Sequence, residues 1–430
     1  MGKVKFIILS VTVLSIISPV FAGKASAKMP EMHGFIEADL GLKLTDDTTK
    51  RDDYNLLEQR LQLKSMYFFE GDNLLSQKST AINFKGDFVV DEYYSGKTSF
   101  DLRELNVSLT PFDFMDTKLG HQILTWGTGD YLFLNDLFPK DYISFFTGRD
   151  DEYLKKPSDA ARFMVYPKYF NMDLVFIPIF EPNETPKGDR LSFFDSFQGG
   201  IAGCDSDRDI SKPPRQIKNS VYAARAYKNF GSYEGAMYFY RGFNPSPKSY
   251  KNEAARQLYY ERLDAYGSSI RGPILDGIGN GEVSYYYSPD DSKGNIRTVQ
   301  NSMIKYLLGY EKDMGNDLRL GFQYMLEQIL DYKQYRNALL ATDYSWDEFR
   351  HILTNRITKY FVNQTVKLSV FTFFSPSDMD AYTRPSVTWN ITDAWTWTTG
   401  ANLIWGKDDT TELGNMKNNK NIFTRLRYSF

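Results

Sequence analysis

Charged side chains that recur at every second position are the residues in this 430-residue chain best placed to do chemistry. Glu37 and Asp39 form one such pair, and Glu58, Arg60 and Lys64 continue the pattern further along. This spacing puts the charges on one face of an extended strand, because side chains two residues apart point the same way. A strand face that carries charges of both signs stays hydrated and can select solutes by charge.

Bond-making chemistry has little support in the sequence. There is no G-x-S-x-G elbow, no H-E-x-x-H pair, no P-loop and no C-x-x-C pair. The histidines, His33, His121 and His351, are far apart, and His121 lacks the companion motif of an outer-membrane lipid hydrolase. Paired acids such as Asp290 and Asp291 hold Ca²⁺ or bridge lipopolysaccharide through divalent ions in some proteins, but more often they solvate a loop. We therefore expect no enzymatic activity, no cofactor and no metal site.

Composition narrows the class of protein further. Hydrophobic residues make up 42% of the chain and charged residues 24%, which excludes a disordered protein. The chain has 51 Lys and Arg residues and 54 Asp and Glu residues, so it lacks the excess of positive charge that would indicate nucleic-acid binding. A mean hydropathy of −0.45 excludes a bundle of apolar membrane helices. The single cysteine excludes a disulfide framework.

One long apolar segment begins the chain. A basic start precedes the apolar stretch 6–17, and small residues follow it. This three-part pattern predicts a secretory signal peptide over residues 1–27, cleaved after Ala22 or Ala27. An uncleaved membrane anchor is the alternative. The mature chain, residues 28–430, is expected to form a single domain.

The mature chain has the period of a β-strand almost throughout. Apolar and polar residues alternate from Gly34 to Leu44, and the same pattern runs from Leu57 to Phe69 and from Leu318 to Leu326. Such segments have about 10 to 13 residues, the length that crosses a bilayer at a tilt. Aromatic residues cluster at their ends, as they do at membrane interfaces. The pattern favours an outer-membrane barrel over a soluble β-sandwich in the periplasm.

The predicted fold is all-β, an antiparallel up-and-down transmembrane barrel of about 18 strands. Short periplasmic turns alternate with long extracellular loops, and an even strand count returns both termini to the periplasm. Two connections, 71–80 and 376–379, fit this alternation less well. The expected strands are residues 33–44, 56–70, 81–94, 99–110, 116–126, 160–167, 170–180, 218–229, 232–243, 258–271, 277–288, 302–313, 316–329, 350–361, 364–375, 380–391, 394–405 and 421–430.

Polar positions on the inward faces of these strands are the candidate pore-lining residues. Acids dominate the first strands and bases the last, and closure of the barrel brings the two groups together. There they either make a transverse field across the pore or simply pair with one another. The candidates are Glu37, Asp39, Glu58, Arg60, Lys64, Asp87, Glu104, Gln122, Arg319, Gln323, Glu327, Arg356, Lys367, Arg384, Arg425 and Arg427.

The connection of residues 127–159 is dense in aromatic and acidic residues. A segment so apolar is costly to expose to water. We expect it to fold into the barrel mouth and narrow the pore. The alternatives are packing over the outer rim or on a neighbouring subunit. Its candidate constriction residues are Trp126, Asp130, Asp136 and Asp141.

The end of the chain carries a candidate assembly signal. Phe430, Tyr428 and Leu426 share one apolar face of the last strand. They resemble the C-terminal signature of outer-membrane barrels, which the barrel-assembly machinery reads.

A longer pattern points to a family. Residues 119–127 read LGHQILTWG, followed by ND at 135–136 and PKD at 139–141. The combination resembles a large group of Gram-negative outer-membrane barrels that have a G-x-Q strand, a Trp-Gly pair and a Pro-x-Asp element. This group is similar to alginate-export-type porins. The resemblance covers most of the mature chain and implies a barrel and a channel, but no particular solute.

Taken together, these features predict an outer-membrane porin for passive diffusion of small solutes through a charged, loop-narrowed lumen. The expected partners are outer-membrane lipid and lipopolysaccharide, the barrel-assembly machinery and two further copies in a homotrimer, with no nucleic acid. The alternatives are a non-conducting surface barrel, such as an adhesin or structural protein, and a channel for hydrophobic compounds or polysaccharide. The mixed charges disfavour polysaccharide.

Overall fold

The structure is a computed structural model that describes residues 30–51, 53–69, 80–341 and 343–430. The predicted signal peptide, residues 1–27, lies outside these residues. No helix in the described part of the chain is long and apolar enough to cross a membrane.

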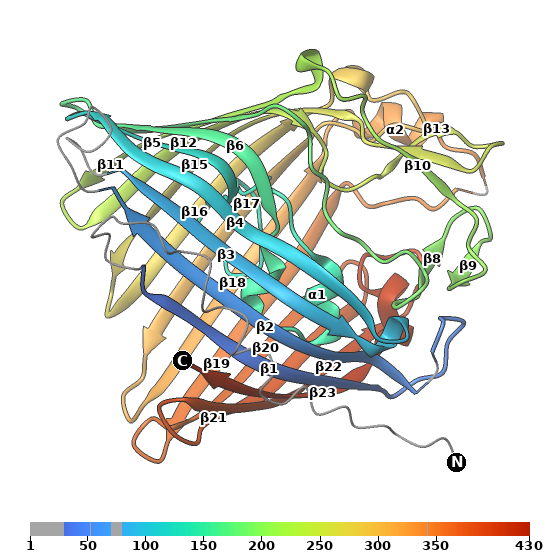
Figure 1. Ribbon diagram of the computed structural model, residues 1–430. Helices are drawn as coiled ribbons and strands as arrows, with labels where there is room; N and C mark the ends of the chain where they lie inside the picture. The colour runs from blue at the N-terminus through green and yellow to red at the C-terminus, as the bar shows by residue number, and fades with distance from the viewer. Residues whose placement is uncertain (1–29, 52, 70–79, 342) are drawn as a thin grey trace. The chain divides into compact units, whose positions relative to one another are not determined.

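Eighteen antiparallel strands in the described part of the chain close into one barrel (Figure 1). Each strand pairs with the next one along the barrel wall, and β23 closes the sheet by pairing with β1. The strands of the wall are β1 (Met32–Lys43), β2 (Tyr54–Phe68), β3 (Ala81–Asp91), β4 (Lys97–Phe112), β5 (Met115–Ile123), β6 (Pro157–Val165), β7 (Asn171–Ile177), β11 (Val221–Phe230), β12 (Tyr233–Phe243), β15 (Arg262–Ile274), β16 (Gly277–Tyr287), β17 (Met303–Asp313), β18 (Leu318–Ile329), β19 (Phe349–Phe361), β20 (Val366–Ser375), β21 (Asp380–Asn390), β22 (Trp395–Gly406) and β23 (Asn421–Ser429). The predicted barrel and its strand number are confirmed, and the soluble sandwich is excluded.

Shorter elements lie in the connections between the wall strands. A two-stranded ladder and a three-stranded sheet form within the long connections. The short strands are β8 (Phe193–Asp195), β9 (Gly200–Ala202), β10 (Asp209–Ser211), β13 (Ser249–Asn252) and β14 (Gln257–Tyr259). The helices are η1 (Glu92–Tyr94), α1 (Tyr142–Thr147), η2 (Asp151–Leu154), η3 (Ile217–Asn219), η4 (Pro289–Asp291), α2 (Tyr332–Ala338) and η5 (Gly414–Asn419).

The alternation of apolar and polar residues in the sequence corresponds to the outer and inner faces of the barrel wall. On β1, Ile36 is 55% exposed on the outer face, whereas the neighbouring Glu37 is 2% exposed within the barrel. The register then sets Glu37 opposite Arg60 on β2 and Arg427 on β23. Because the side-chain period is two, one such register fixes the facing of every residue along the strand.

Exposed aromatic residues mark both ends of the outer face. Trp389 and Trp395 flank the short turn 391–394, and Tyr222 and Trp405 lie at the opposite end of their strands. Two girdles of aromatic side chains, one at each edge of an apolar band, are typical of membrane-spanning barrels.

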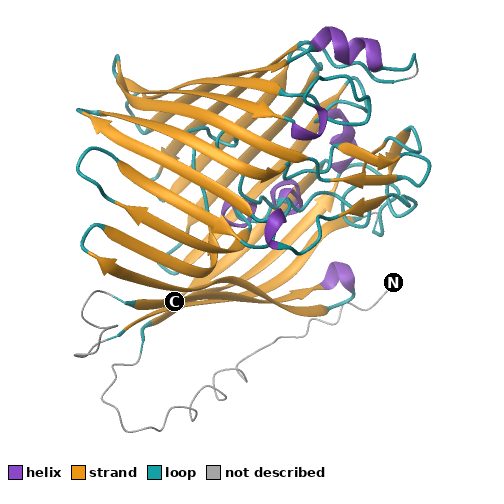
Figure 2. Cartoon of the chain, turned by 90° about the horizontal axis from the view of Figure 1, so that it is seen from above, coloured by secondary structure: helices purple, strands orange, loops and turns teal. Residues whose placement is uncertain are grey.

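The connections differ in length between the two ends of the barrel. One end carries tight turns, such as 113–114, 231–232 and 275–276, and the other carries the long connections that hold α2 and the small sheets (Figures 1 and 2). The connection 376–379 is short although it lies at the long-connection end.

Candidate functional site

The connection between β5 and β6, residues 124–156, runs through the interior of the barrel, where α1 is visible in Figure 1. We call it the inner segment. Its side chains contact inward-facing residues of strands on several sides of the wall, as described below. It neither covers the outer rim nor projects away from the barrel.

Aromatic packing attaches the inner segment to the wall. Tyr131 packs edge-on against Phe371 of β20, with ring centres 4.8 Å apart. Phe145 packs against Tyr382 of β21 at 5.5 Å. Removal of these rings from water explains why a segment so rich in aromatic residues lies inside the barrel.

Glu282 of β16 holds the beginning of the inner segment. Its carboxylate accepts hydrogen bonds from the Thr128 backbone N–H, from the Thr128 hydroxyl at 2.7 Å and from the Gly129 N–H at 3.0 Å. The side-chain amide of Asn135 donates to the same carboxylate at 2.7 Å. One buried acid therefore satisfies four donors of the segment, which fixes its path across the barrel.

Asp130 extends from the inner segment toward β18 and β19. Arg356 meets it with two parallel hydrogen bonds, Nε–Oδ2 at 2.5 Å and Nη2–Oδ1 at 2.8 Å. The side chain of Gln323 accepts from the Asp130 N–H at 2.9 Å. The carboxylate side chain is 41% exposed, so this ion pair faces open space.

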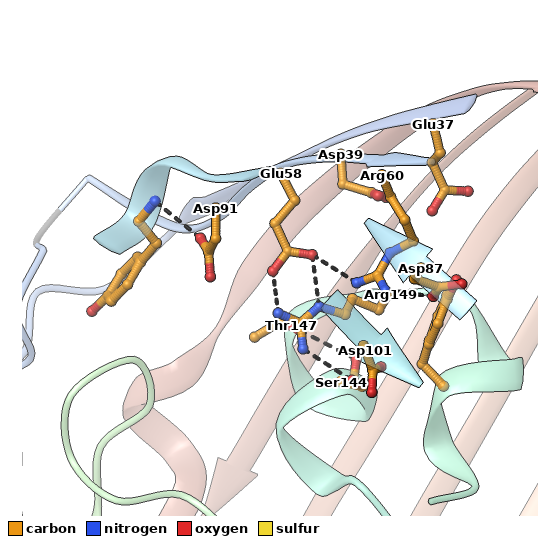
Figure 3. Close-up of polar contacts among 12 residues, drawn as sticks. Glu37, Asp39, Glu58, Arg60, Asp87, Asp91, Asp101, Ser144, Thr147 and Arg149 are labelled. Atoms are coloured by element: carbon orange, nitrogen blue, oxygen red, sulfur yellow. Dashed lines mark hydrogen bonds and ion pairs between the residues drawn. The ribbon is translucent and has the colours of Figure 1, made fainter. Parts of the chain in front are cut away.

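Glu58 is the centre of a buried charge cluster at the other end of the inner segment (Figure 3). Arg149 donates to it through Nε at 2.9 Å and through a second guanidinium nitrogen, and Arg60 donates at 3.2 Å. Arg60 also pairs with Asp87 at 2.7 Å, and Arg149 donates to Ser144 at 3.0 Å. Since Glu58 is 2% exposed, its charge depends on these guanidinium groups rather than on water.

Three acids that follow Arg149 attach the segment to β21, β23 and β3. Asp150 lies 3.1 Å from Arg425 and 3.3 Å from Arg427. Asp151 pairs with Arg384 at 2.5 Å, and Lys85 donates to Glu152 at 2.6 Å.

The predicted meeting of acids and bases at barrel closure is also present. Arg427 donates to Glu37 at 2.6 Å, and Arg425 lies 3.4 Å from the same carboxylate. Arg425 also lies 4.0 Å from Asp39. Of the two expected outcomes, these groups pair with one another.

A chamber of about 1440 Å³ lies between the inner segment and the long connections. Its walls include aromatic residues of the segment, Phe133, Tyr142 and Phe146 among them. Arg208, from the long connection after β7, lies 3.6 Å above the ring of Phe193, and burial lowers its pKa to about 10. The chamber thus combines apolar surface with scattered charges of both signs.

Comparison with known proteins gives fold-level neighbours. No family model matches the chain, and no curated protein does. Among solved structures, OccAB4 of Acinetobacter baumannii has a TM-score of 0.55 at 10% identity, with 95% of this chain and 100% of that chain covered. OccK11 (OpdR) of Pseudomonas aeruginosa scores 0.53 at 8% identity, with 93% and 96% covered. The outer-membrane protein OpdK of the same species scores 0.53 at 9% identity, with 93% and 97% covered.

The chain has the fold of an outer-membrane porin. The identities are too low to carry more than the fold. The porin fold explains why the pairs described above join an inner segment to the wall: a wide barrel has an interior that needs filling.

Several of the predicted residues serve the packing of the porin fold. Gln122 is fully buried and donates to the backbone carbonyls of Lys118 and Ala160, so it faces backbone rather than open lumen. Asp136 forms a buried pair with Lys140 at 2.9 Å. Asp141 caps α1 by accepting from the Ser144 N–H at 2.9 Å. Trp126 donates from its indole nitrogen to Asp173 of β7 at 3.1 Å. That the inner segment constricts a conducting path stays a prediction.

The remaining candidates face the barrel interior with varied surroundings. Glu104 pairs with Lys118 at 3.0 Å, and Glu327 with Lys305 at 2.6 Å. Arg319 lies 3.5 Å from Glu311 and is largely exposed, Lys64 is exposed, and Lys367 is half-buried. No group of three or more metal-ligating side chains occurs among the described residues.

Two central residues were not among the sequence candidates. Glu282 lies at an inward-facing position of the predicted strand 277–288, so the alternation of this strand could have identified it as a pore-lining candidate. Arg149 follows the left-handed Gly148 at the end of α1, and no periodic pattern surrounds it. Only the folded segment shows that Arg149 reaches Glu58.

Acid is expected to loosen the inner segment. Burial raises the pKa of Asp150, but Arg425, Arg427 and the backbone N–H of Glu152 together bring it below the ordinary value. Burial likewise raises the pKa of Asp151, and Arg384 and the Tyr131 hydroxyl bring it below the ordinary value. A lowered pKa means that these tethers are intact above the ordinary Asp pKa of about 3.9 and are lost as the pH falls through the lower folded values. We predict that single-channel conductance is constant from neutral pH down to about 4 and changes below it.

The matched control replaces both acids by amides. The double variant Asp150→Asn/Asp151→Asn should already show the acid form of the channel at neutral pH, with a smaller further change on acidification. An unchanged acid step in this variant would assign the step to other carboxylates.

Proposed function

We propose that the protein is a porin of the Gram-negative outer membrane through which small solutes diffuse passively. One observation carries the proposal: a closed barrel that is apolar on its outer face and charged inside, with an inner segment fixed across it. The outer face suits lipid, whereas the inner charges need water and serve solutes in transit. The fold shared with outer-membrane porins supports this function.

The orientation and the partners belong to the same proposal. The long connections face the exterior and both termini face the periplasm, which matches the even strand number. Phe430, Tyr428 and Leu426 are exposed on the outer face of the final strand, which suits recognition by the barrel-assembly machinery. Three copies of the chain form a homotrimer in outer-membrane lipid. The chain is related to alginate-export-type porins. It has no enzymatic activity.

The chamber above the inner segment favours solutes with an apolar body. Its wall combines rings such as Phe146 and Tyr344 with charges that are mostly paired, among them Lys305 with Glu327. Rings of this kind contact apolar or aromatic surface and do not require a charged solute. Passage of hydrophobic compounds is therefore the second candidate function.

Planar-bilayer recording of the refolded mature protein tests the proposal. We expect steady single channels and, in a salt gradient, a reversal potential that gives the ion preference. A folded, heat-modifiable barrel without conductance would contradict the diffusion function and favour a surface barrel.

A further inference from the structure

Four exposed basic residues gather at the long-connection end of β11, β12 and β15. Arg215 and Lys218 lie just before β11, Arg241 lies near the end of β12, and Arg262 begins β15. We call these four residues the rim cluster. The structure uses none of them in the barrel interior.

Hydrogen bonds and strand register bring the rim cluster together. Arg262 donates to the side-chain oxygen of Asn219, the residue after Lys218, at 3.2 Å. The amide of Asn219 in turn donates to the carbonyl of Pro214, the residue before Arg215, at 2.8 Å. On the wall, Arg241 lies opposite Tyr222 of β11 and two positions along β12 from the partner of Arg262.

Carboxylates offset only part of the positive charge at this place. Arg241 lies 3.2 Å from Asp264, and Asp290 accepts from the backbone N–H of Arg262. Arg215 and Lys218 are both exposed, and no ion pair within the described part of the chain involves either of them. Exposed cations without counter-charges attract anions from the surroundings, and guanidinium groups bind phosphate with two parallel hydrogen bonds.

The rim cluster lies at the level where lipid headgroups meet the barrel. Tyr222 and Tyr266 are exposed on the outer face directly beside it and belong to the aromatic girdle at this end. Ile217, between Arg215 and Lys218, is 79% exposed. Basic groups immediately beyond the aromatic girdle lie beside the phosphates of the leaflet that surrounds the barrel.

We propose that the rim cluster binds the phosphate groups of lipopolysaccharide in the outer leaflet. The proposal rests on the proposed function for its orientation, since the long-connection end then faces the leaflet that holds this lipid. Lys218 and Arg215 supply the charge that no carboxylate among the described residues offsets, the remaining N–H groups of Arg262 and Arg241 supply guanidinium donors, and Ile217 contacts the boundary between headgroup and acyl chains.

Binding to the purified, detergent-solubilised full barrel tests the inference. Native mass spectrometry titrates three probes: purified lipopolysaccharide with a short core, the same lipid after removal of its phosphates, and inorganic phosphate. Wild type should retain the phosphorylated lipid, and Lys218→Glu/Arg262→Glu should weaken that binding by about tenfold or more. The dephosphorylated lipid should bind wild type and variant alike.

A charge-matched control lies in the same sector of the barrel at its other end. Lys168 and Lys228 are exposed near the short turns, and Lys168→Glu/Lys228→Glu should change lipid binding by less than about twofold. Equal loss in both double variants, or equal binding of inorganic phosphate and lipid, would overturn the inference. So would preferential capture of an acidic protein.

Conductance separates this inference from the proposed function. Both double variants should run as heat-modifiable barrels and conduct like wild type, because neither pair of residues enters the interior. A wild-type barrel that binds the lipid but does not conduct would defeat the diffusion function alone. A barrel that conducts, but binds the lipid equally well with and without the substitutions Lys218→Glu/Arg262→Glu, would defeat the rim inference alone.

Discussion

Replacement of Glu58 by Ala is expected to destabilise the folded barrel by about 3–5 kcal/mol. Glu58 is buried and receives hydrogen bonds from both Arg60 and Arg149. Without it, Arg60 retains Asp87, but Arg149 retains only the Ser144 hydroxyl as a side-chain hydrogen-bond partner among the described residues, with Asp141 as an acidic neighbour that makes no hydrogen bond to it. A buried guanidinium without a counter-charge is far costlier than a lost contact. Urea unfolding of the protein refolded into lipid vesicles measures the effect.

A second substitution tests that reasoning. Removal of both charges in Glu58→Ala/Arg149→Met should restore a good part of the lost stability, because no unpaired charge remains in the interior. If the double variant is as unstable as the sum of the two single variants, the destabilisation comes from lost packing rather than from the stranded charge.

Neutralisation of Asp130 is expected to move the ion preference of the channel toward anions. The pair of Asp130 with Arg356 is exposed to the lumen, so Asp130→Asn leaves a guanidinium that faces the passing solution. A unit charge about 6 Å from an ion in water changes its energy by about 0.7 kcal/mol, which is roughly threefold in local concentration. Reversal potentials in a KCl gradient give the permeability ratio.

Arg356 supplies the mirror-image control. Arg356→Gln should shift the preference toward cations by a similar amount, and the double variant Asp130→Asn/Arg356→Gln should return close to wild type. Shifts of the same sign in both single variants would mean that the inner segment has moved and that charge is not the cause. Raising the salt concentration should diminish both shifts through screening.

The two predictions differ because the interior contains two kinds of charge. Glu58 and Arg60 are shielded from water and hold the inner segment to the wall. Asp130, whose side chain is 41% exposed, remains partly in contact with solvent. The buried pairs of Glu58 therefore govern stability, whereas the exposed pair of Asp130 with Arg356 governs which ions pass.

The fold was largely predictable because its signal is local. The alternation around Glu37 and Asp39, and again around Glu58 and Arg60, gives each strand and its inward face without knowledge of its partner. Strand ends were less well defined: β6 begins at Pro157, although the pattern predicted a start at 160. There the polar Ser158 and Asp159 do not distinguish a strand from the loop before it.

The candidate site was predictable only in part. The alternation along their strands identified Arg356, Arg384 and Arg427 as inward-facing. The acidic partner of each lies on the inner segment, whose sequence has no strand-like alternation from which to predict it. Asp136 and Asp141 looked like pore residues in the sequence, yet one pairs with Lys140 and the other caps α1.

The sequence by itself determined which side chains face the interior of the barrel and that the segment after Trp126 is too apolar to stay in water. The tertiary structure decided which charges meet. Arg149 is 91 residues from Glu58 in the chain, and Asp130 is 226 residues from Arg356. A periodic pattern fixes the direction of a side chain within its own strand, whereas pairing across a lumen depends on closure of the whole barrel around the segment that crosses it.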